Sequence, residues 1–132
     1  LSMSNFMPYK GEHSVDFPTD PGLNVMVVFG DNMRGKTSLL NALRWVFYGR
    51  ALGRHLHEIP LHELLNKDAA FEGDFTMEVR VRYEADGHFY DLRRRASRRE
   101  HVAIPARPED MVVECSLQKD SMVVAGNQVE ME

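Results

Sequence analysis

A glycine-rich loop between an apolar run and a helical pattern constrains this chain more than any other feature. Residues 23–49 read LNVMVVFGDNMRGKTSLLNALRWVFYG, and the loop runs from Gly30 to Thr37. It fits G-x-x-x-x-G-K-[ST], the pattern of a loop that cradles phosphate groups when a strand precedes it and a helix follows it. The flanking apolar run and helical period meet that condition, so the sequence predicts nucleotide binding.

Each residue type in the loop has a physical role. Gly30 and Gly35 lack a Cβ, so the backbone can bend tightly and bring its N–H groups against phosphate oxygens. Lys36 can reach the β- and γ-phosphates, and the Thr37 hydroxyl can ligate Mg²⁺. The helix that begins near Lys36 directs its positive dipole end at the same anion. The predicted nucleotide-binding residues are Gly30, Asp31, Asn32, Met33, Arg34, Gly35, Lys36, Thr37 and Ser38.

Length and composition limit the classes of protein that the chain can belong to. Its 132 residues, of which 43% are hydrophobic and 27% charged, are typical of one modest globular domain. A net charge of −4 gives no overall basic field, and the single cysteine, Cys115, excludes an internal disulfide. We therefore expect a reducing cytoplasm and no membrane, because no apolar run approaches the length of a membrane span. The start at Leu1, within a strand-like segment, indicates a piece of a longer protein.

Hydrophobic periodicity divides the chain into four predicted regions. Residues 1–22 are expected to form a β-hairpin, and residues 23–49 the strand, loop and helix. Residues 50–74 form a connector, and residues 75–132 form antiparallel β-hairpins whose apolar residues alternate with charged ones. The predicted fold class is α/β with α+β character, in which a P-loop strand–helix unit lies beside an antiparallel β-layer.

The two elements that flank the loop are predicted in more detail. The run from Val25 to Phe29 is apolar on both faces, as expected of a central strand in a covered sheet. The helix from Lys36 to Tyr48 carries a wide apolar stripe, with Asn41 and Arg44 on its wetter face. Gly49 follows the last helical residue and is suited to cap it.

A group of arginines offers a second candidate site. Five of the sixteen basic residues lie within seven positions: Arg93, Arg94, Arg95, Arg98 and Arg99. Such a group can contact DNA phosphates, or it can be the solvated face of a strand and its turn. The apolar run plus acid that would position Mg²⁺ and an attacking water is not found, so no catalytic residue for hydrolysis is predicted in this segment.

The sequence resembles the N-terminal segment of SMC/RecF-type ATPase heads. Asn5-Phe6, Tyr9 and Asp16-Phe17 match the short hairpin that precedes the loop in that family. The matching residues of the loop and helix are Gly30, Asn32, Gly35, Lys36, Thr37, Leu39, Leu40, Asn41, Ala42, Tyr48 and Gly49. Two positions depart from the family pattern. Met33 replaces a glycine, and Met7 replaces an arginine near the nucleotide, so no nucleotide contact is assigned to Met7.

The resemblance implies the N-terminal half of an ABC-type ATPase head that binds ATP and Mg²⁺. The rest of the site would come from the downstream half of the same head and from a second head, with ATP sandwiched in a homodimer. This segment alone would be inactive as an ATPase. Residues 50–53 and 59–61 look most like DndD, the ATPase of bacterial DNA phosphorothioation. DNA, subunits for DNA modification or defence, and a bacterial cytoplasm are the implied partners and location.

Two other classes of function are also compatible with the sequence. The chain could be a different P-loop enzyme, such as a small-molecule kinase, although a β-rich region after the P-loop helix is unusual for kinases. It could also be a non-enzymatic module with a vestigial loop that binds DNA or a protein partner through its arginines.

Overall fold

The computed structural model describes residues 1–30 and 35–126. The described strands are β1 (Ser2–Phe6), β2 (Tyr9–Ser14), β3 (Thr76–Ala85), β4 (His88–Arg98), β5 (Met111–Lys119) and β6 (Met122–Ala125). The described helices are α1 (Lys36–Tyr48), α2 (Lys67–Phe71) and the 3₁₀ turns η1 (Arg54–Leu56), η2 (Leu61–Leu64) and η3 (Pro108–Asp110). Among these residues, no helix has the length and apolar character needed to cross a membrane.

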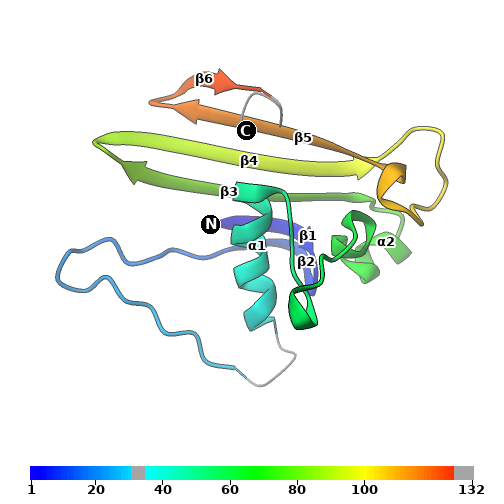
Figure 1. Cartoon of the computed structure of the whole chain (residues 1–132), viewed down its shortest axis with the longest axis horizontal. Helices are drawn as coiled ribbons and strands as arrows, with labels where there is room; N and C mark the ends of the chain where they lie inside the picture. The colour runs from blue at the N-terminus through cyan, green and yellow to red at the C-terminus, as the bar shows by residue number, and fades with distance from the viewer. Residues whose placement is uncertain (31–34, 127–132) are drawn as a thin grey trace.

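All six strands form one antiparallel sheet with the order β2-β1-β3-β4-β5-β6 (Figure 1). The long β3–β4 hairpin turns at Asp86 and Gly87, where both residues have positive φ angles of 52° and 76°. Two successive positive φ angles match the right-handed twist of the strands, which is why Asp-Gly favours this turn. The tight turn fixes the register of the hairpin from Ala85 opposite His88 to Thr76 opposite Ser97.

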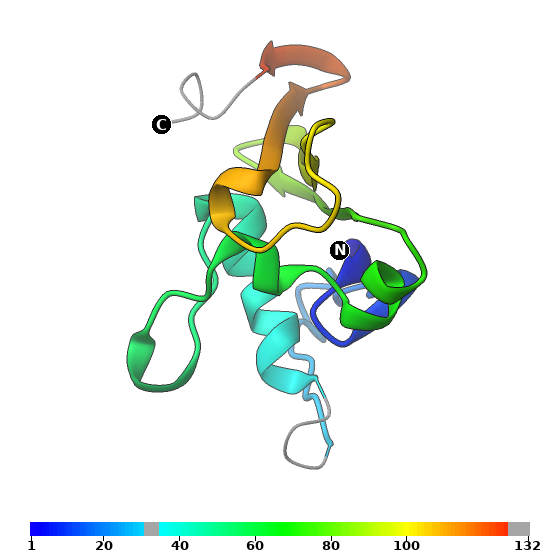
Figure 2. The ribbon, with the colours of Figure 1, turned by 90° about the vertical axis from the view of Figure 1, so that its right-hand side faces the viewer.

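Alternation along the strands gives the sheet one covered face. Met77, Val79 and Val81 of β3 are buried, and α1 packs on β3 and β4 over this face (Figure 2). The helix contributes Trp45 and Val46, which are 1% and 0% exposed. The core therefore lies between one helix and the middle of the sheet.

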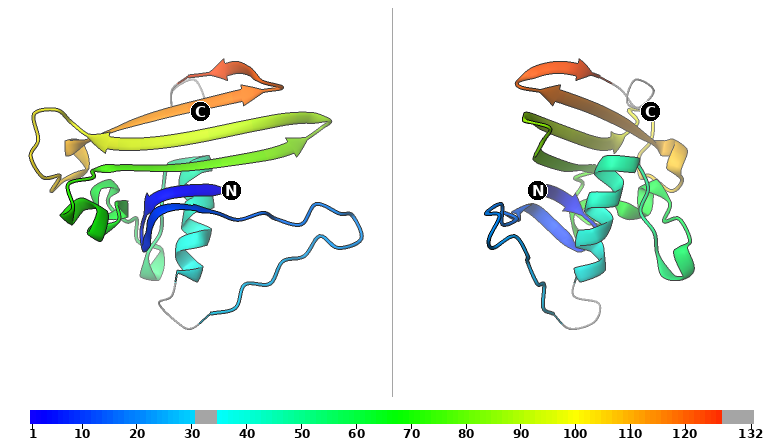
Figure 3. Two further views of the ribbon diagram at one scale, coloured as in Figure 1. Left: turned by 180° about the vertical axis from the view of Figure 1, so that it is seen from behind. Right: turned by 60° about the vertical axis from the view of Figure 1, so that its left-hand side comes forward.

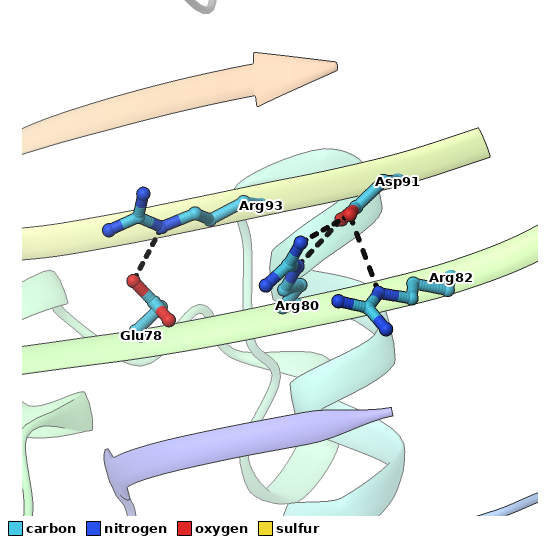
Figure 4. Close-up of polar contacts among 5 residues, drawn as sticks. All are labelled: Glu78, Arg80, Arg82, Asp91 and Arg93. Atoms are coloured by element: carbon cyan, nitrogen blue, oxygen red, sulfur yellow. Dashed lines mark hydrogen bonds and ion pairs between the residues drawn. The ribbon is translucent and has the colours of Figure 1, made fainter. Parts of the chain in front are cut away.

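The opposite face of β3 and β4 is polar and held by ion pairs (Figure 4). Arg80 donates to Asp91 from Nε at 2.7 Å and also from its terminal nitrogen, and Arg82 lies 3.4 Å from the same carboxylate. Arg93 donates to Glu78 at 2.5 Å. These cross-strand pairs join neighbouring strands on the face that α1 does not cover, and opposite charges in such positions stabilise a sheet.

The predicted central strand before the loop is wrong. Residues 24–30 have no strand pairing, and Leu23 makes only an isolated bridge to Asp20. The segment leaves the sheet after β2 and extends away from it before α1 begins (Figure 3). Val25 and Phe29 are 80% and 88% exposed. A strand needs a neighbour for its backbone N–H and C=O groups, and none of the described strands lies along this segment.

Candidate nucleotide-binding site

Gly35 sets the geometry at the start of α1. It is the N-cap residue, with φ 101° and ψ 2°, and such a backbone conformation is accessible to glycine at little cost. Its carbonyl oxygen accepts the first helical hydrogen bond, from Leu39 N at 2.9 Å. The first turn of α1 carries no acidic side chain, so the positive end of the helix dipole is not neutralised there.

Lys36 links the two ends of the loop. Its ammonium donates to the carbonyl oxygen of Gly30 at 2.5 Å, across six positions of the chain. A Cβ at Gly30 would lie 3.6 Å from the Lys36 side chain, which is ordinary contact. Lys36 and Thr37 are exposed, whereas Ser38 is buried. The structure thus places a cation and a hydroxyl together at the solvent-accessible start of α1.

These residues fit a phosphate group and Mg²⁺. An exposed ammonium and the positive end of a 13-residue helix attract an anion. A hydroxyl oxygen such as that of Thr37 is a hard ligand of the kind that Mg²⁺ prefers. Of the predicted binding residues, Asp31, Asn32, Met33 and Arg34 lie outside the described residues, and Ser38 is buried.

Tyr9 contacts the end of the loop although it lies far from the loop in sequence. Its hydroxyl donates to the carbonyl oxygen of Gly35 at 2.7 Å, although 26 positions separate the two residues. A Cβ at Gly35 would lie 2.8 Å from that hydroxyl oxygen, closer than real Cβ atoms come. The sequence marked Tyr9 only as part of a family pattern, and no spacing rule points to this contact.

Asn5 fixes the turn between β1 and β2 that carries Tyr9. It has φ 52° and is 5% exposed. Its amide nitrogen donates to Asp74 at 2.9 Å and to the carbonyl oxygen of Thr76 at 3.1 Å, and its oxygen accepts from Gly11 N at 2.8 Å. An asparagine tolerates this left-handed conformation better than most residues, and the three side-chain hydrogen bonds hold Asn5 in this conformation.

A second buried asparagine holds the same turn from the connector. Asn66 donates from its side chain to the carbonyl oxygen of Met7 at 2.8 Å, and its backbone N–H donates to that of Asn5 at 2.8 Å. Met7 N also donates to the carbonyl oxygen of Leu64 at 2.7 Å. Asn66 additionally caps α2 by accepting from Ala69 N at 2.9 Å. The turn is therefore fixed from two directions by groups distant in sequence.

The predicted arginine group does not form a single surface. Arg94 is 2% exposed and reaches under α1, where its Nε lies 3.4 Å from the carbonyl oxygen of Val46. Successive residues of a strand point to opposite faces, so Arg93 lies with Glu78 on the open face, which is the face of the sheet that α1 does not cover. Arg94 is thus part of the covered face, and its predicted DNA contact does not agree with its burial.

The last two arginines of the group contact the loop that follows β4. Arg98 donates to the carbonyl oxygen of Ala103 at 2.9 Å, and its guanidinium lies 4.7 Å from the centre of the Phe75 ring. Arg99 donates from Nε to the carbonyl oxygen of Glu109 at 2.7 Å. Both side chains help to order the β4–β5 connection, and DNA contact by Arg93, Arg95, Arg98 and Arg99 stays a prediction.

A loop of this spacing at the start of a helix, with its lysine and threonine exposed, is typical of P-loop nucleoside triphosphatases. Comparison with known families agrees with that class. A family model described as an AAA domain matches residues 1–121, and the chain belongs to this AAA domain family. The match supports an ATPase-type segment similar to those of SMC/RecF-like proteins. A search of curated proteins finds none that matches the chain.

Proposed function

We propose that the chain binds ATP with Mg²⁺ and is the phosphate-holding segment of an SMC-like ATPase. The observation that carries this proposal is the pair of exposed side chains, Lys36 and Thr37, at the positive end of α1. Lys36 would exchange its contact with the Gly30 carbonyl for phosphate oxygens, and Thr37 would ligate the metal ion. Bound Mg²⁺ neutralises charge on the phosphates.

Hydrolysis would take place in a longer protein that contains this segment. The remaining part of the site would come from the downstream half of the head and from a second head that closes over ATP. Membership of the AAA domain family supports an ATPase in general. The finer proposal, a role in bacterial DNA modification or defence at cytoplasmic DNA, rests on the sequence resemblance to DndD-like proteins.

Calorimetric titration with ATP and MgCl₂ tests the binding proposal. We expect the wild-type chain to bind at about the micromolar level, which corresponds to roughly −8 kcal/mol. Lys36→Ala removes the cation, so affinity should fall by at least about tenfold, as expected for a charged hydrogen bond worth about 1.5–3 kcal/mol. Lys67→Ala, which removes an exposed lysine at α2, is the matched control and should bind as the wild type does.

Two results would contradict the proposal: no binding by the wild-type chain, or equal binding by the wild type and Lys36→Ala. In the longer protein, the same Lys36→Ala substitution should abolish ATP turnover. Retained turnover there would argue against this loop as the nucleotide site.

A further inference from the structure

We propose that the Tyr9 hydroxyl is a positioning group that orients the Gly35–Lys36 peptide at the start of α1. This inference rests on the proposed nucleotide binding and adds a residue from a separate part of the chain. Tyr9 lies at the start of β2, and its hydroxyl donates to the Gly35 carbonyl oxygen at 2.7 Å. The contact is close: a Cβ at position 35 would lie 2.8 Å from the Tyr9 hydroxyl oxygen, so a residue with a Cβ there would force the Tyr9 side chain to shift.

Holding the Gly35 carbonyl also fixes the Lys36 N–H. These two groups belong to one planar peptide unit and point in opposite directions, so the orientation of one determines that of the other. The Gly35 oxygen accepts from Leu39 N at 2.9 Å as well as from Tyr9, which uses both of its lone pairs. The peptide is therefore held from the helix and from the hairpin at once, with its N–H directed to the N-terminal end of α1.

The bond to Tyr9 should also make the Lys36 N–H a better donor. Hydrogen bonds in a chain polarise one another, so a peptide whose oxygen accepts two bonds donates more strongly from its nitrogen. Backbone N–H groups of such loops hold the α- and β-phosphates. Tyr9 would thereby contribute to phosphate binding without touching the nucleotide.

Tyr9 has the rigidity that a positioning group needs. The turn before it is held by the buried side chains of Asn5 and Asn66, and its ring lies 5.5 Å from that of His13 at 61°. Partial burial raises the pKa of Tyr9, so the hydroxyl keeps its proton and remains a donor. The Gly35 carbonyl is thus held by a fixed part of the sheet edge.

The affinity test compares Tyr9→Phe with the wild type by calorimetry, using ATP and ADP with MgCl₂. Phenylalanine keeps the ring and removes only the donor, so affinity for both nucleotides should fall by about three- to tenfold, the loss expected for one hydrogen bond. Tyr48→Phe is the matched control, because it removes an exposed hydroxyl at the far end of α1. Its affinity and its unfolding midpoint in urea should equal those of the wild type.

A second measurement reports on the Gly35–Lys36 peptide in the nucleotide-free chain, because the resonance of an amide depends on the hydrogen bonds that its peptide unit makes. The ¹⁵N–¹H resonance of the Lys36 amide should shift in Tyr9→Phe and stay in place in Tyr48→Phe. If the wild type binds ATP and Tyr9→Phe binds it equally well, the positioning role is overturned while nucleotide binding stands. If the wild type does not bind, the proposed function fails, and an unshifted Lys36 resonance in Tyr9→Phe then overturns the inference independently.

Discussion

The two segments on either side of the loop differ in how they meet the rest of the protein. Residues 24–30 and helix α1 are both rich in apolar side chains. In α1, Trp45 is 1% exposed and its ring lies 5.7 Å from that of Phe6. Before the loop, Phe29 is 88% exposed. An apolar sequence therefore led to burial on one side of the loop and to an extended, exposed segment on the other.

The difference shows that an apolar run needs a suitable neighbour before it becomes core. A helix satisfies most of its backbone hydrogen bonds within itself and needs only one surface to cover its apolar stripe. A strand that is apolar on both faces needs partner strands beside it and layers above and below it. Helix α1 packs on the apolar face of β3 and β4, whereas the segment before the loop has no such neighbour among the described residues.

The largest effect that tests this comparison is expected from Trp45→Ala. The indole of Trp45 is fully buried and lies beside the Phe6 ring, so its removal leaves a cavity and costs about 3–5 kcal/mol of unfolding free energy. Urea unfolding followed by circular dichroism measures this cost. Phe29→Ala removes an aromatic ring that is exposed, and the unfolding free energy should change by no more than about 0.5 kcal/mol. If both variants lose a similar amount of unfolding free energy, residues 24–30 are packed in solution, and the difference between the two segments does not hold.

A smaller effect is expected from Asn41→Ala. Asn41 is 1% exposed, which corrects its expected place on the wetter face of the helix. Its amide donates to the carbonyl oxygen of Leu52 at 2.9 Å and accepts from Leu52 N at 3.0 Å. Removing it leaves two backbone groups without partners, so we expect a loss of about 2–4 kcal/mol in urea unfolding. Asn24→Ala, on the exposed side of the loop, is the control, and an equal loss there would contradict the comparison.

The smallest effect concerns a partly exposed ion pair on the sheet face that α1 does not cover. The hydrogen bonds from Arg80 hold the pKa of the Asp91 carboxyl below its usual range. A lowered folded-state pKa means that the pair stabilises the protein above about pH 4, and that this contribution is lost as the pH falls through the folded pKa. For a partly exposed pair, we expect about 1 kcal/mol or less. Asp91→Asn should therefore lose less stability than the wild type between pH 4 and pH 2 in urea unfolding.

Asp16→Asn, which changes an exposed carboxylate outside the sheet, is the matched control for the pH series. It should show the same loss of stability with acid as the wild type. If Asp91→Asn and the wild type lose equal stability, the ion pairs of the open face contribute nothing measurable. Burial alone would then decide which residues contribute to stability.

Much of the sheet and of α1 could be predicted because the signals are local. The alternation from Met77 to Tyr83, the Asp86-Gly87 turn and the helical period from Lys36 to Tyr48 depend on residues close in sequence. The spacing of the loop likewise predicts Lys36 and Thr37 as the residues that hold phosphate and Mg²⁺, and the structure places both at the exposed start of α1. Local patterns carry this information because backbone geometry repeats every two or 3.6 residues.

The sequence by itself determined the loop spacing, the helix that follows it and the alternating strands. Only the tertiary structure decided that Asn41 and Arg94 are buried and that the segment before the loop is exposed. Only the tertiary structure placed the Tyr9 hydroxyl against the Gly35 carbonyl. The physical reason is the same in each case. Burial and hydrogen bonding between residues far apart in sequence depend on which surfaces pack together after the elements have formed. Local periodicity does not contain this information.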